Sequence, residues 1–314
     1  MTPEFRGVYS VLVTPFTETG HLDLAALERV VDFSIGAGAH GLVTPVVVSE
    51  FFTLNDDERR AVVETVVTAT AGRIPVVAGV SAPSIHGAAE RAGHAAEVGA
   101  DAVIAVPPYV KRASWTETVS YYEAIANASD GLPVFVQNAD NPSGTPLSPA
   151  QLLELADRIE AVSWIKEESG FSSQKISAVL AQAGTNVRGI MGGKGARYAL
   201  DEFQRGICGT MPGCEFTDLH VALWDALDGG DHDRADHAYR LLLPLVEMED
   251  QYGGAAFCKE VLRMRGVLTS TFVREPGSPS LDRQATDLLA RHLRVAEENI
   301  TRSGNQAAKH VIDV

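Results

Sequence analysis

The sequence has few cysteines, no secretion signal and no long apolar run, and each shortage excludes a class of protein. Its three cysteines, Cys208, Cys214 and Cys258, fit no zinc spacing and cannot pair evenly. A reducing, cytoplasmic location is therefore expected. The first residues lack the apolar segment of a signal peptide, and no apolar run approaches the roughly 18 residues needed to span a bilayer.

Basic residues are also scarce. The chain of 314 residues holds 26 Lys and Arg against 41 Asp and Glu, a formal net charge of −15. Nucleic acids and anionic membranes require clustered basic residues, so neither is expected as a partner. A small anionic substrate is still compatible, because the local field of a pocket can oppose the net charge. The nine histidines are scattered without a ligand pattern, so no metal or other cofactor is expected.

What the chain does contain is a repeated unit of strand, loop and helix. Helical spacing of apolar residues separates the strand-like runs, and several helices end in Gly-containing turns that lead directly into the next run. Asn55 with Glu58, and Ser148 with Gln151, predict helix N-termini with capping boxes. Continuous apolar strands indicate a parallel sheet covered by helices. Eight runs predict strands, at residues 8–13, 41–48, 74–80, 102–106, 133–137, 162–165, 187–191 and 209–211.

Eight units favour a closed (β/α)8 barrel, the TIM barrel, over an open doubly wound sheet. An open sheet usually carries a Gly-rich phosphate loop after an early strand, and none occurs here. The segment 192–195, Gly-Gly-Lys-Gly, follows the seventh strand and lacks the spacing of a phosphate loop. A turn between strand and helix is the simpler interpretation, with phosphate binding as the alternative.

Beyond about residue 218 the pattern is purely helical, with amphipathic segments at 235–249, 255–265 and 281–298. We therefore expect a barrel at 1–217. The last barrel helix and a C-terminal helical extension packed on the barrel would cover 218–300. A flexible tail is expected at 301–314, where periodicity is lost.

The active site of such a barrel lies at the carboxyl ends of the strands. Lys166 follows the apolar run 162–165, so its side chain is expected to enter the barrel interior. Burial favours the neutral form of an amine, which can attack a ketone and form an imine. The alternative is a lysine that caps the strand and pairs with Glu167 or Glu168.

Glu168 lies two residues after Lys166, so strand periodicity puts both side chains on one face and Glu167 on the other. A carboxylate beside an iminium carbon can remove or deliver a proton at the adjacent carbon. A simple salt bridge to Lys166 is the structural alternative.

Several ordered motifs together resemble the dihydrodipicolinate synthase / N-acetylneuraminate lyase superfamily, over residues of about 5 to 300. The resemblance implies that Lys166 forms a Schiff base with a 2-keto acid, and that the protein assembles as a homotetramer. The motifs are Thr14-Pro15-Phe16, Ser49 to Leu54 leading to Glu58-Arg59, Pro107-Pro108-Tyr109, and Ile165 to Gly170.

The departures from this family are informative. Most members carry Gly-Thr-Thr-Gly-Glu after the second strand, where this chain has Val-Val-Val-Ser-Glu at 46–50. The familiar tyrosine of strand five is replaced by Gln137, and the partner tyrosine by Val110. The tyrosine–threonine–tyrosine proton relay is therefore missing, and neither Gln nor Val can act as a general acid. A lysine-biosynthetic synthase or an ordinary pyruvate aldolase is not expected.

The replacements resemble the dehydratase branch, in particular 2-keto-3-deoxyarabonate dehydratase. The motifs concerned are 137–139, 143–145, Ser49-Glu50 before a Phe-rich turn, and the Glu two residues after the lysine. A dehydratase of a short 2-keto-3-deoxy sugar acid is the leading hypothesis. A class I pyruvate-dependent aldolase or hydratase-aldolase, and a non-catalytic ligand-binding relative, are the alternatives. We expect Lys166, Glu168 and Gln137 to be catalytic, with substrate contacts from Thr14, Val48, Ser49, Asn138, Gly193 and Tyr109.

Ser49 could hold the substrate carboxylate through its hydroxyl and neighbouring amides, or simply begin a helix. Gln137 could bind a substrate hydroxyl, or be satisfied by backbone. Glu50 is expected to brace its loop from behind. Tyr109 is expected to shape the pocket or to approach a neighbouring subunit's site.

Overall fold

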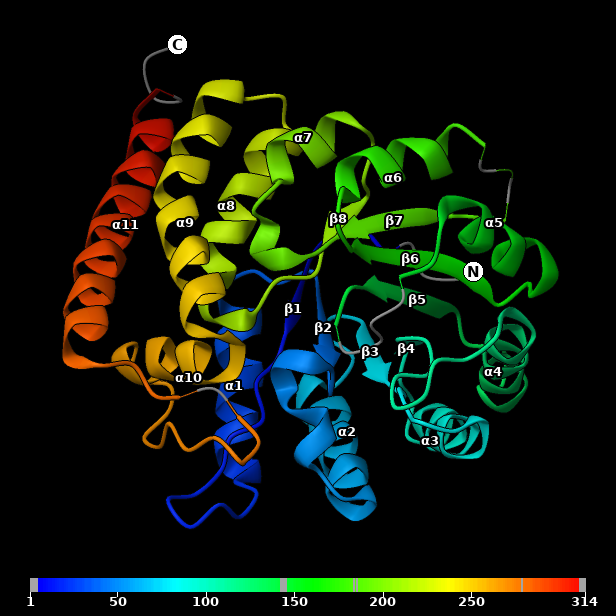
Figure 1. The fold of residues 1–314 in the computed structure, drawn as a ribbon. Coiled ribbons are helices and arrows are strands. Elements are labelled where there is room, and N and C mark those ends of the chain that lie inside the picture. The colour runs from blue at the N-terminus through cyan, green and yellow to red at the C-terminus, as the bar shows by residue number, and fades with distance from the viewer. Residues whose placement is uncertain (1–4, 142–145, 183, 185, 278, 311–314) are drawn as a thin grey trace.

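The computed structural model describes residues 5–141, 146–182, 184, 186–277 and 279–310, with side chains up to residue 300. Eight parallel strands form a closed barrel in chain order, and β8 pairs with β1 (Figure 1). The predicted TIM barrel is confirmed. The strands are β1 (Gly7–Val11), β2 (Gly41–Thr44), β3 (Val76–Gly79), β4 (Ala102–Ala105), β5 (Val134–Ala139), β6 (Val162–Glu168), β7 (Gly189–Gly192) and β8 (Gly209–Thr210).

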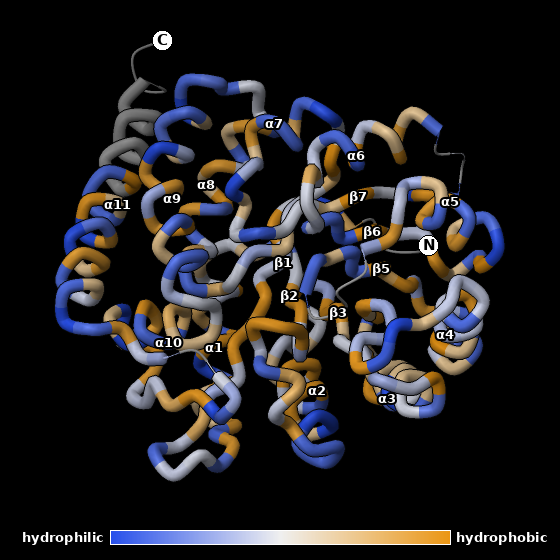
Figure 2. Tube along the Cα trace, viewed as in Figure 1, coloured by the Kyte–Doolittle hydropathy of each residue, from blue (hydrophilic) through white to orange (hydrophobic). Residues whose placement is uncertain are grey.

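Helices cover the outside of the barrel, with hydrophilic residues toward solvent and apolar residues toward the strands (Figure 2). Both predicted capping boxes are present, at Asn55–Glu58 and Ser148–Gln151. The barrel helices are α1 (Leu24–Gly36), α2 (Asp56–Thr70), α3 (Ile85–Glu97), α4 (Trp115–Ala128), α5 (Pro149–Arg158), α6 (Ser172–Leu180), α7 (Ala199–Gln204) and α8 (Thr217–Asp228).

Three further helices form the extension: α9 (His232–Tyr252), α10 (Gly254–Met264) and α11 (Arg283–His310). They share an apolar core with α8, built from residues such as Leu223, Leu245, Phe257 and Leu289. Helix α11 lies along α9 (Figure 1) and continues into residues 301–310, part of the segment expected to be a loose tail. The division of the chain into barrel, extension and tail stays a prediction. Residues 311–314 lie outside the described residues.

Two strand boundaries differ from the expectation in a way that shapes the site. Strand β2 ends at Thr44, before Pro45, because proline has no N–H for the ladder. The apolar residues that follow it form the short 3-10 helices η1 (Val47–Ser49) and η2 (Phe51–Thr53) instead. Strand β6 continues to Glu168, so three charged residues that we expected after the strand belong to its end.

Aromatic side chains fill the barrel one layer below the site. Phe5 packs edge-on against Phe135 and Trp164, at ring-centroid distances of 5.3 and 5.1 Å, and Phe135 stacks on Trp164 at 5.5 Å. Trp164 and Lys166 are two residues apart on β6, so their side chains lie on the same face of the strand. Lys166 therefore points into the barrel interior directly above the aromatic layer. The layer closes the barrel beneath the amine.

Candidate active site

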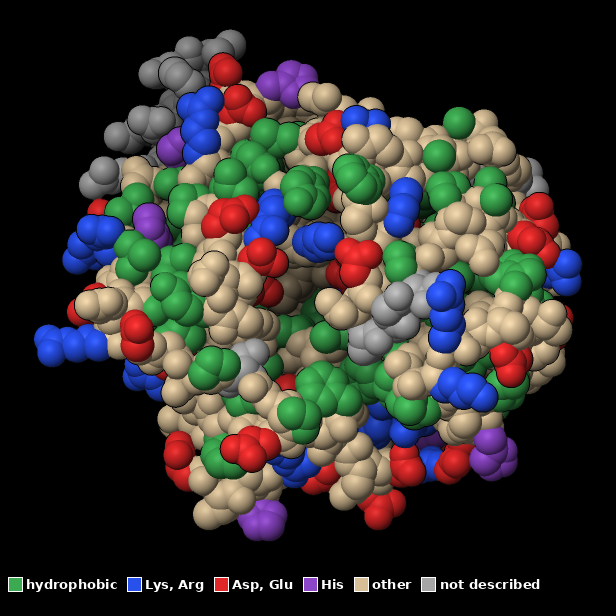
Figure 3. Space-filling view, in the orientation of Figure 1, with side chains coloured by type: hydrophobic (Ala, Val, Ile, Leu, Met, Phe, Trp, Pro, Cys, Tyr) green, Lys and Arg blue, Asp and Glu red, His purple; other side chains and the backbone are tan. Residues whose placement is uncertain are grey.

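A cavity of about 760 Å³ opens at the carboxyl ends of the strands. In the space-filling view it is the central hollow, with acidic and basic side chains around it (Figure 3). Strands β5 and β6 contribute Gln137, Lys166 and Glu168. Helix η1, which follows β2, contributes Val47 and Val48. The extension closes the cavity with residues of α9 and α10.

Lys166, Glu168 and Gln137 form one connected group. Lys166 is 5% exposed, and its Nζ lies 3.2 Å from Glu168 Oε2. The other carboxylate oxygen, Oε1, accepts a hydrogen bond of 2.5 Å from Gln137 Nε2. Gln137 is opposite Lys166 in the β5–β6 register, so the strand pairing itself brings the three side chains together. The buried Oε1 of Gln137 has no hydrogen-bond partner among the described residues.

Gly193 makes room for Glu168. A Cβ at Gly193 would lie 2.4 Å from Glu168 Oε2 and 2.6 Å from Glu168 Cβ, both closer than real Cβ contacts. Gly193 was predicted to contact the substrate. It is not among the described residues that line the cavity, whereas its neighbours Lys194 and Gly195 are. Lys194 Nζ lies 3.7 Å from Asp140 Oδ2 across the rim.

Asn138 and Glu167 lie on the other face of their strands. Asn138 Nδ2 donates to Glu167 Oε2 at 2.7 Å, and Asn138 exchanges two hydrogen bonds with the backbone of Leu147. Glu167 also accepts from the backbone N–H of Ser169 at 2.9 Å, and burial raises the pKa of its carboxyl. Asn138, a predicted substrate contact, is therefore committed to holding the β5–β6 strand ends.

The hydroxyls of Thr14 and Ser49 form hydrogen bonds with backbone groups in and around the loop after β2. The Ser49 hydroxyl donates to the carbonyl of Leu12 at 2.5 Å and accepts from the backbone N–H of Val46 at 3.1 Å. The Thr14 hydroxyl donates to the carbonyl of Ser49 at 2.7 Å. Neither side chain is among the described residues that line the cavity, whereas Val48 is.

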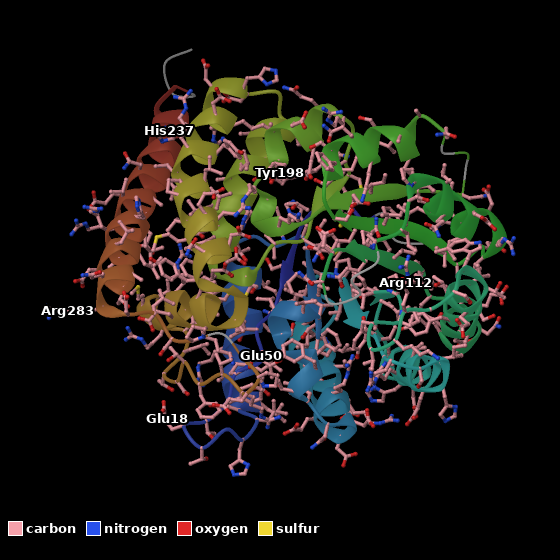
Figure 4. The ribbon with its side chains drawn as sticks, viewed as in Figure 1. Glu18, Glu50, Arg112, Tyr198, His237 and Arg283 are labelled. Carbon is pink, nitrogen blue, oxygen red and sulfur yellow. The ribbon has the colours of Figure 1, made fainter. Side chains whose placement is uncertain are left out.

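Glu50 has a left-handed backbone (φ 55°) and is 2% exposed, beside the start of α2 (Figure 4). Its carboxylate pairs with Lys259 at 2.5 Å and accepts from the backbone N–H of Arg274 at 3.0 Å. Arg274 in turn binds both carboxylate oxygens of Glu58. These ion pairs fasten the extension to the loop after β2. Sequence reasoning missed Lys259, although a lysine among the apolar residues of α10 was a signal for a buried partner.

Tyr109 packs edge-on against Phe51 at 5.6 Å, outside the described lining of the cavity. Burial raises the pKa of its phenol. Its approach to a neighbouring subunit stays a prediction. The motif 143–145, which contributed to the dehydratase resemblance, lies outside the described residues.

The chain is similar to one family of known proteins in both sequence and fold. The dihydrodipicolinate synthetase family matches residues 4–294. The L-2-keto-3-deoxyarabonate dehydratase of Azospirillum brasilense is 35% identical over 277 residues, which cover 88% of this chain and 89% of that protein. The crystal structure of dihydrodipicolinate synthase from Rhodopseudomonas palustris superposes with a TM-score of 0.86 at 27% identity, over 94% of this chain and 98% of that one.

A third relative is YagE, a prophage protein of the dihydrodipicolinic acid synthase family from E. coli, solved in complex with pyruvate. It has a TM-score of 0.85 and 25% identity, over 93% of this chain and 99% of that one. The chain therefore belongs to the dihydrodipicolinate synthetase family and is a lyase that acts on a small molecule. In the described part of the chain, no helix has the length and apolarity to cross a membrane.

Proposed function

We propose that the protein is a hydro-lyase that removes water from a short 2-keto-3-deoxy sugar acid held as a Schiff base on Lys166. The observation that carries the proposal is the connected group of Lys166, Glu168 and Gln137 in the cavity wall. Among the described lining residues there is no tyrosine, so a carboxylate takes the place of a phenolic proton relay. A carboxylate is ordinarily ionised at neutral pH whereas a phenol is not, so it can accept a proton from carbon directly. In a dehydration, water is the only group that leaves the substrate.

The first step is condensation. The Lys166 amine is buried above the aromatic layer, and Glu168 at 3.2 Å can take up the protons exchanged between amine and carbinol. Attack on carbon 2 of the keto acid and loss of water give an iminium ion. The iminium withdraws electrons from carbon 3 and makes its hydrogens acidic.

Elimination follows at carbons 3 and 4. Glu168 removes a proton from carbon 3, and the electron pair enters the enamine. The enamine then forms the carbon 3–carbon 4 double bond as the carbon 4–oxygen bond breaks, and the hydroxide takes up a proton to leave as water. Hydrolysis of the iminium restores Lys166 and releases an unsaturated 2-keto acid that tautomerises. The free Oε1 of Gln137 is available to accept a hydrogen bond from a substrate hydroxyl.

Two relatives support this assignment. The A. brasilense protein, 35% identical, is an L-2-keto-3-deoxyarabonate dehydratase. The structure of YagE contains pyruvate, the simplest 2-keto acid. The substrate we infer is accordingly a five-carbon 2-keto-3-deoxy acid, which a cavity of about 760 Å³ has room to admit.

Borohydride trapping tests the Schiff base. We expect reduction in the presence of 2-keto-3-deoxypentonates to attach one substrate skeleton to the peptide that contains Lys166. Lys166→Ala should abolish both labelling and turnover, whereas Lys111→Ala, at an exposed position in the loop before α4, should change neither. Labelling at another lysine would refute the proposal.

Product analysis tests the reaction class. We expect a product that keeps all five carbons and has lost one water. Release of pyruvate with glycolaldehyde would instead identify a carbon–carbon bond-cleaving aldolase. Stoichiometric binding without any product would identify a non-catalytic relative.

A further inference from the structure

A second acidic group lies at the cavity, in the corner between the end of β8 and the extension. It consists of Glu215 on the 3-10 helix η4 (Cys214–Phe216), Glu249 on α9 and Cys258 on α10. One atom from each of the three side chains lies within 4.8 Å of the others. Glu215 is fully buried, and neither of its carboxyl oxygens has a hydrogen-bond partner. Glu249 lines the same cavity as Lys166 and Glu168.

Two glycines provide the space for these carboxyl groups. A Cβ at Gly213 would lie 2.4 Å from Glu215 Oε2, and one at Gly195 would lie 3.0 Å from Glu249 Oε2. The chain also turns sharply after α9, at Gly253 with φ 85°, which lets α10 bring Cys258 within 3.9 Å of Glu249 Oε1. Three separate segments are therefore shaped around one acidic pair.

The nearby cations are largely engaged with other acids. Arg197 binds Glu247 at 2.9 Å and Asp250 at 3.1 Å. Arg265 binds Asp218 at 2.9 Å. The charged and titratable groups that face the pair from the surrounding elements are Lys166, Cys214, Arg197, Asp250, Cys258 and Arg265.

Two carboxyl groups this close together, one of them fully buried, disfavour simultaneous ionisation, because each negative charge raises the pKa of the other group. Burial, and next the charge of Glu215, raises the pKa of Glu249 well above its ordinary value, while Arg197 and Lys166 act in the opposite direction. Burial likewise raises the pKa of Glu215. Burial and mutual repulsion therefore both favour a proton on one member of the pair, at the wall of the cavity that also holds the Lys166–Glu168 ion pair.

We propose that Glu249, which carries the proton of this carboxyl pair, donates that proton to the hydroxyl leaving carbon 4 of the substrate. This inference rests on the proposed function. Glu168 takes the proton from carbon 3, the electron pair moves through the enamine, the carbon 4–oxygen bond breaks, and the oxygen leaves as water with the proton from Glu249. Glu168 is then protonated and Glu249 ionised, and transfer of one proton through the water in the cavity restores both groups. The division removes the need for Glu168 to act as base and acid on the same substrate.

Glu249→Gln separates the two proton transfers, because glutamine keeps the size of the side chain and cannot act as an acid. Two assays are needed. Dehydration of a 2-keto-3-deoxypentonate requires both groups, whereas exchange of the methyl protons of pyruvate in deuterium oxide requires only Lys166 and Glu168. We expect Glu249→Gln to lower kcat for dehydration by about 10²-fold or more, with KM little changed and pyruvate exchange within about threefold of the wild type.

Three further variants make the result specific. Glu168→Gln should lose both activities. Glu247→Gln, the same substitution on the exposed side of α9, should lose neither. Glu215→Gln removes the charge that keeps the proton on Glu249, so the fall of kcat at high pH should move to lower pH by about one unit or more. A merely structural change would not move that limb.

The outcomes are distinct. Normal dehydration by Glu249→Gln overturns this inference and leaves the proposed function standing. Parallel loss of exchange and dehydration in Glu249→Gln also overturns it, since the variant would then have disturbed Lys166 or Glu168. One equivalent of tightly bound metal in the wild type, lost in Glu215→Gln, would identify a cation site in place of the proton of the pair. A wild type that exchanges pyruvate protons and dehydrates no 2-keto-3-deoxy acid refutes the proposed function and the inference together.

Discussion

Replacing Gly193 by alanine should disable Glu168 without changing any group that takes part in the chemistry. The φ of Gly193 is −137°, outside the left-handed region that favours glycine, and the expected effect is argued from the added methyl group. That methyl group would lie 2.4 Å from Glu168 Oε2 and 2.6 Å from Glu168 Cβ. Rotation of the carboxylate relieves only the first contact, because Cβ is fixed to the strand.

The magnitude follows from these distances. An ordinary contact needs a separation about 1 Å greater, and a misplacement of about 1 Å can cost about 10²-fold in rate. General base catalysis contributes about 10²- to 10⁴-fold, so a loss of kcat of about 10²- to 10³-fold is expected, equivalent to about 3–4 kcal/mol. Overpacking should also lower the free energy of unfolding by about 1–3 kcal/mol.

Pyruvate methyl-proton exchange in deuterium oxide, followed by NMR, measures the effect without knowledge of the natural substrate. Gly193→Ala should lose exchange and still be trapped on Lys166 by borohydride. Gly93→Ala is the control, since a Cβ there would lie 3.7 Å from the nearest atom, the carbonyl oxygen of Ala128 on another helix. In the Glu168→Gln background, Gly193→Ala should cost less than about threefold further, because the effect acts through Glu168. Exchange within threefold of the wild type in the single variant would refute the reasoning.

Three further predictions concern buried charges and the free energy of unfolding. Burial raises the pKa of Glu202 from 4.5 to about 7, so the folded state holds the extra proton and the free energy of unfolding falls as pH rises from about 4.5 to about 7. Urea titrations of Glu202→Gln should lack this fall of up to about 3 kcal/mol. The assignment would be contradicted if the variant and the wild type lost stability in parallel over this pH range. Burial lowers the pKa of His220 from 6.5 to about 4, so the opposite holds: stability is lost as pH falls from about 6.5 to about 4, and His220→Gln should flatten that part of the same profile. Lys259→Met leaves Glu50 buried without its cation and should cost about 3–5 kcal/mol, while the double variant with Glu50→Gln should recover part of it in thermal melts. Equal losses in the single and double variants would mean that the unpaired charge of Glu50 is not what destabilises the single variant.

The barrel could be predicted because its strands are continuous apolar runs separated by helical periodicity, and each run predicted one strand. Boundaries failed where local chemistry interrupts the pattern. Pro45 ends β2 although three valines follow it, and these valines form a turn. Strand β6 outlasts its apolar run because Glu167 finds partners in Asn138 and Ser169 on the outer face.

The site was predictable only as far as strand periodicity reaches. Alternation along β6 placed Lys166 and Glu168 on one face, and the structure has them in contact. The hydrogen bonds of Ser49 and Asn138 could not be predicted, because their backbone partners, Leu12 and Leu147, become neighbours only in the folded chain. Glu249 gave no signal, because its position depends on how α9 packs on the barrel, and no local pattern encodes that packing.

The helical extension supplies one side of the cavity and is fastened to the loop after β2 by the Lys259–Glu50 pair. The amine of Lys166 thus comes from the barrel, whereas part of the cavity wall around the substrate comes from the helical extension. Substitutions at Asp250, Gly254 and Ala255, which line the cavity from α9 and α10, can alter which molecules enter while β6 and Glu249 stay untouched. A directed library at those lining positions, which spares Glu249 and Lys259, is a direct route to altered substrate choice.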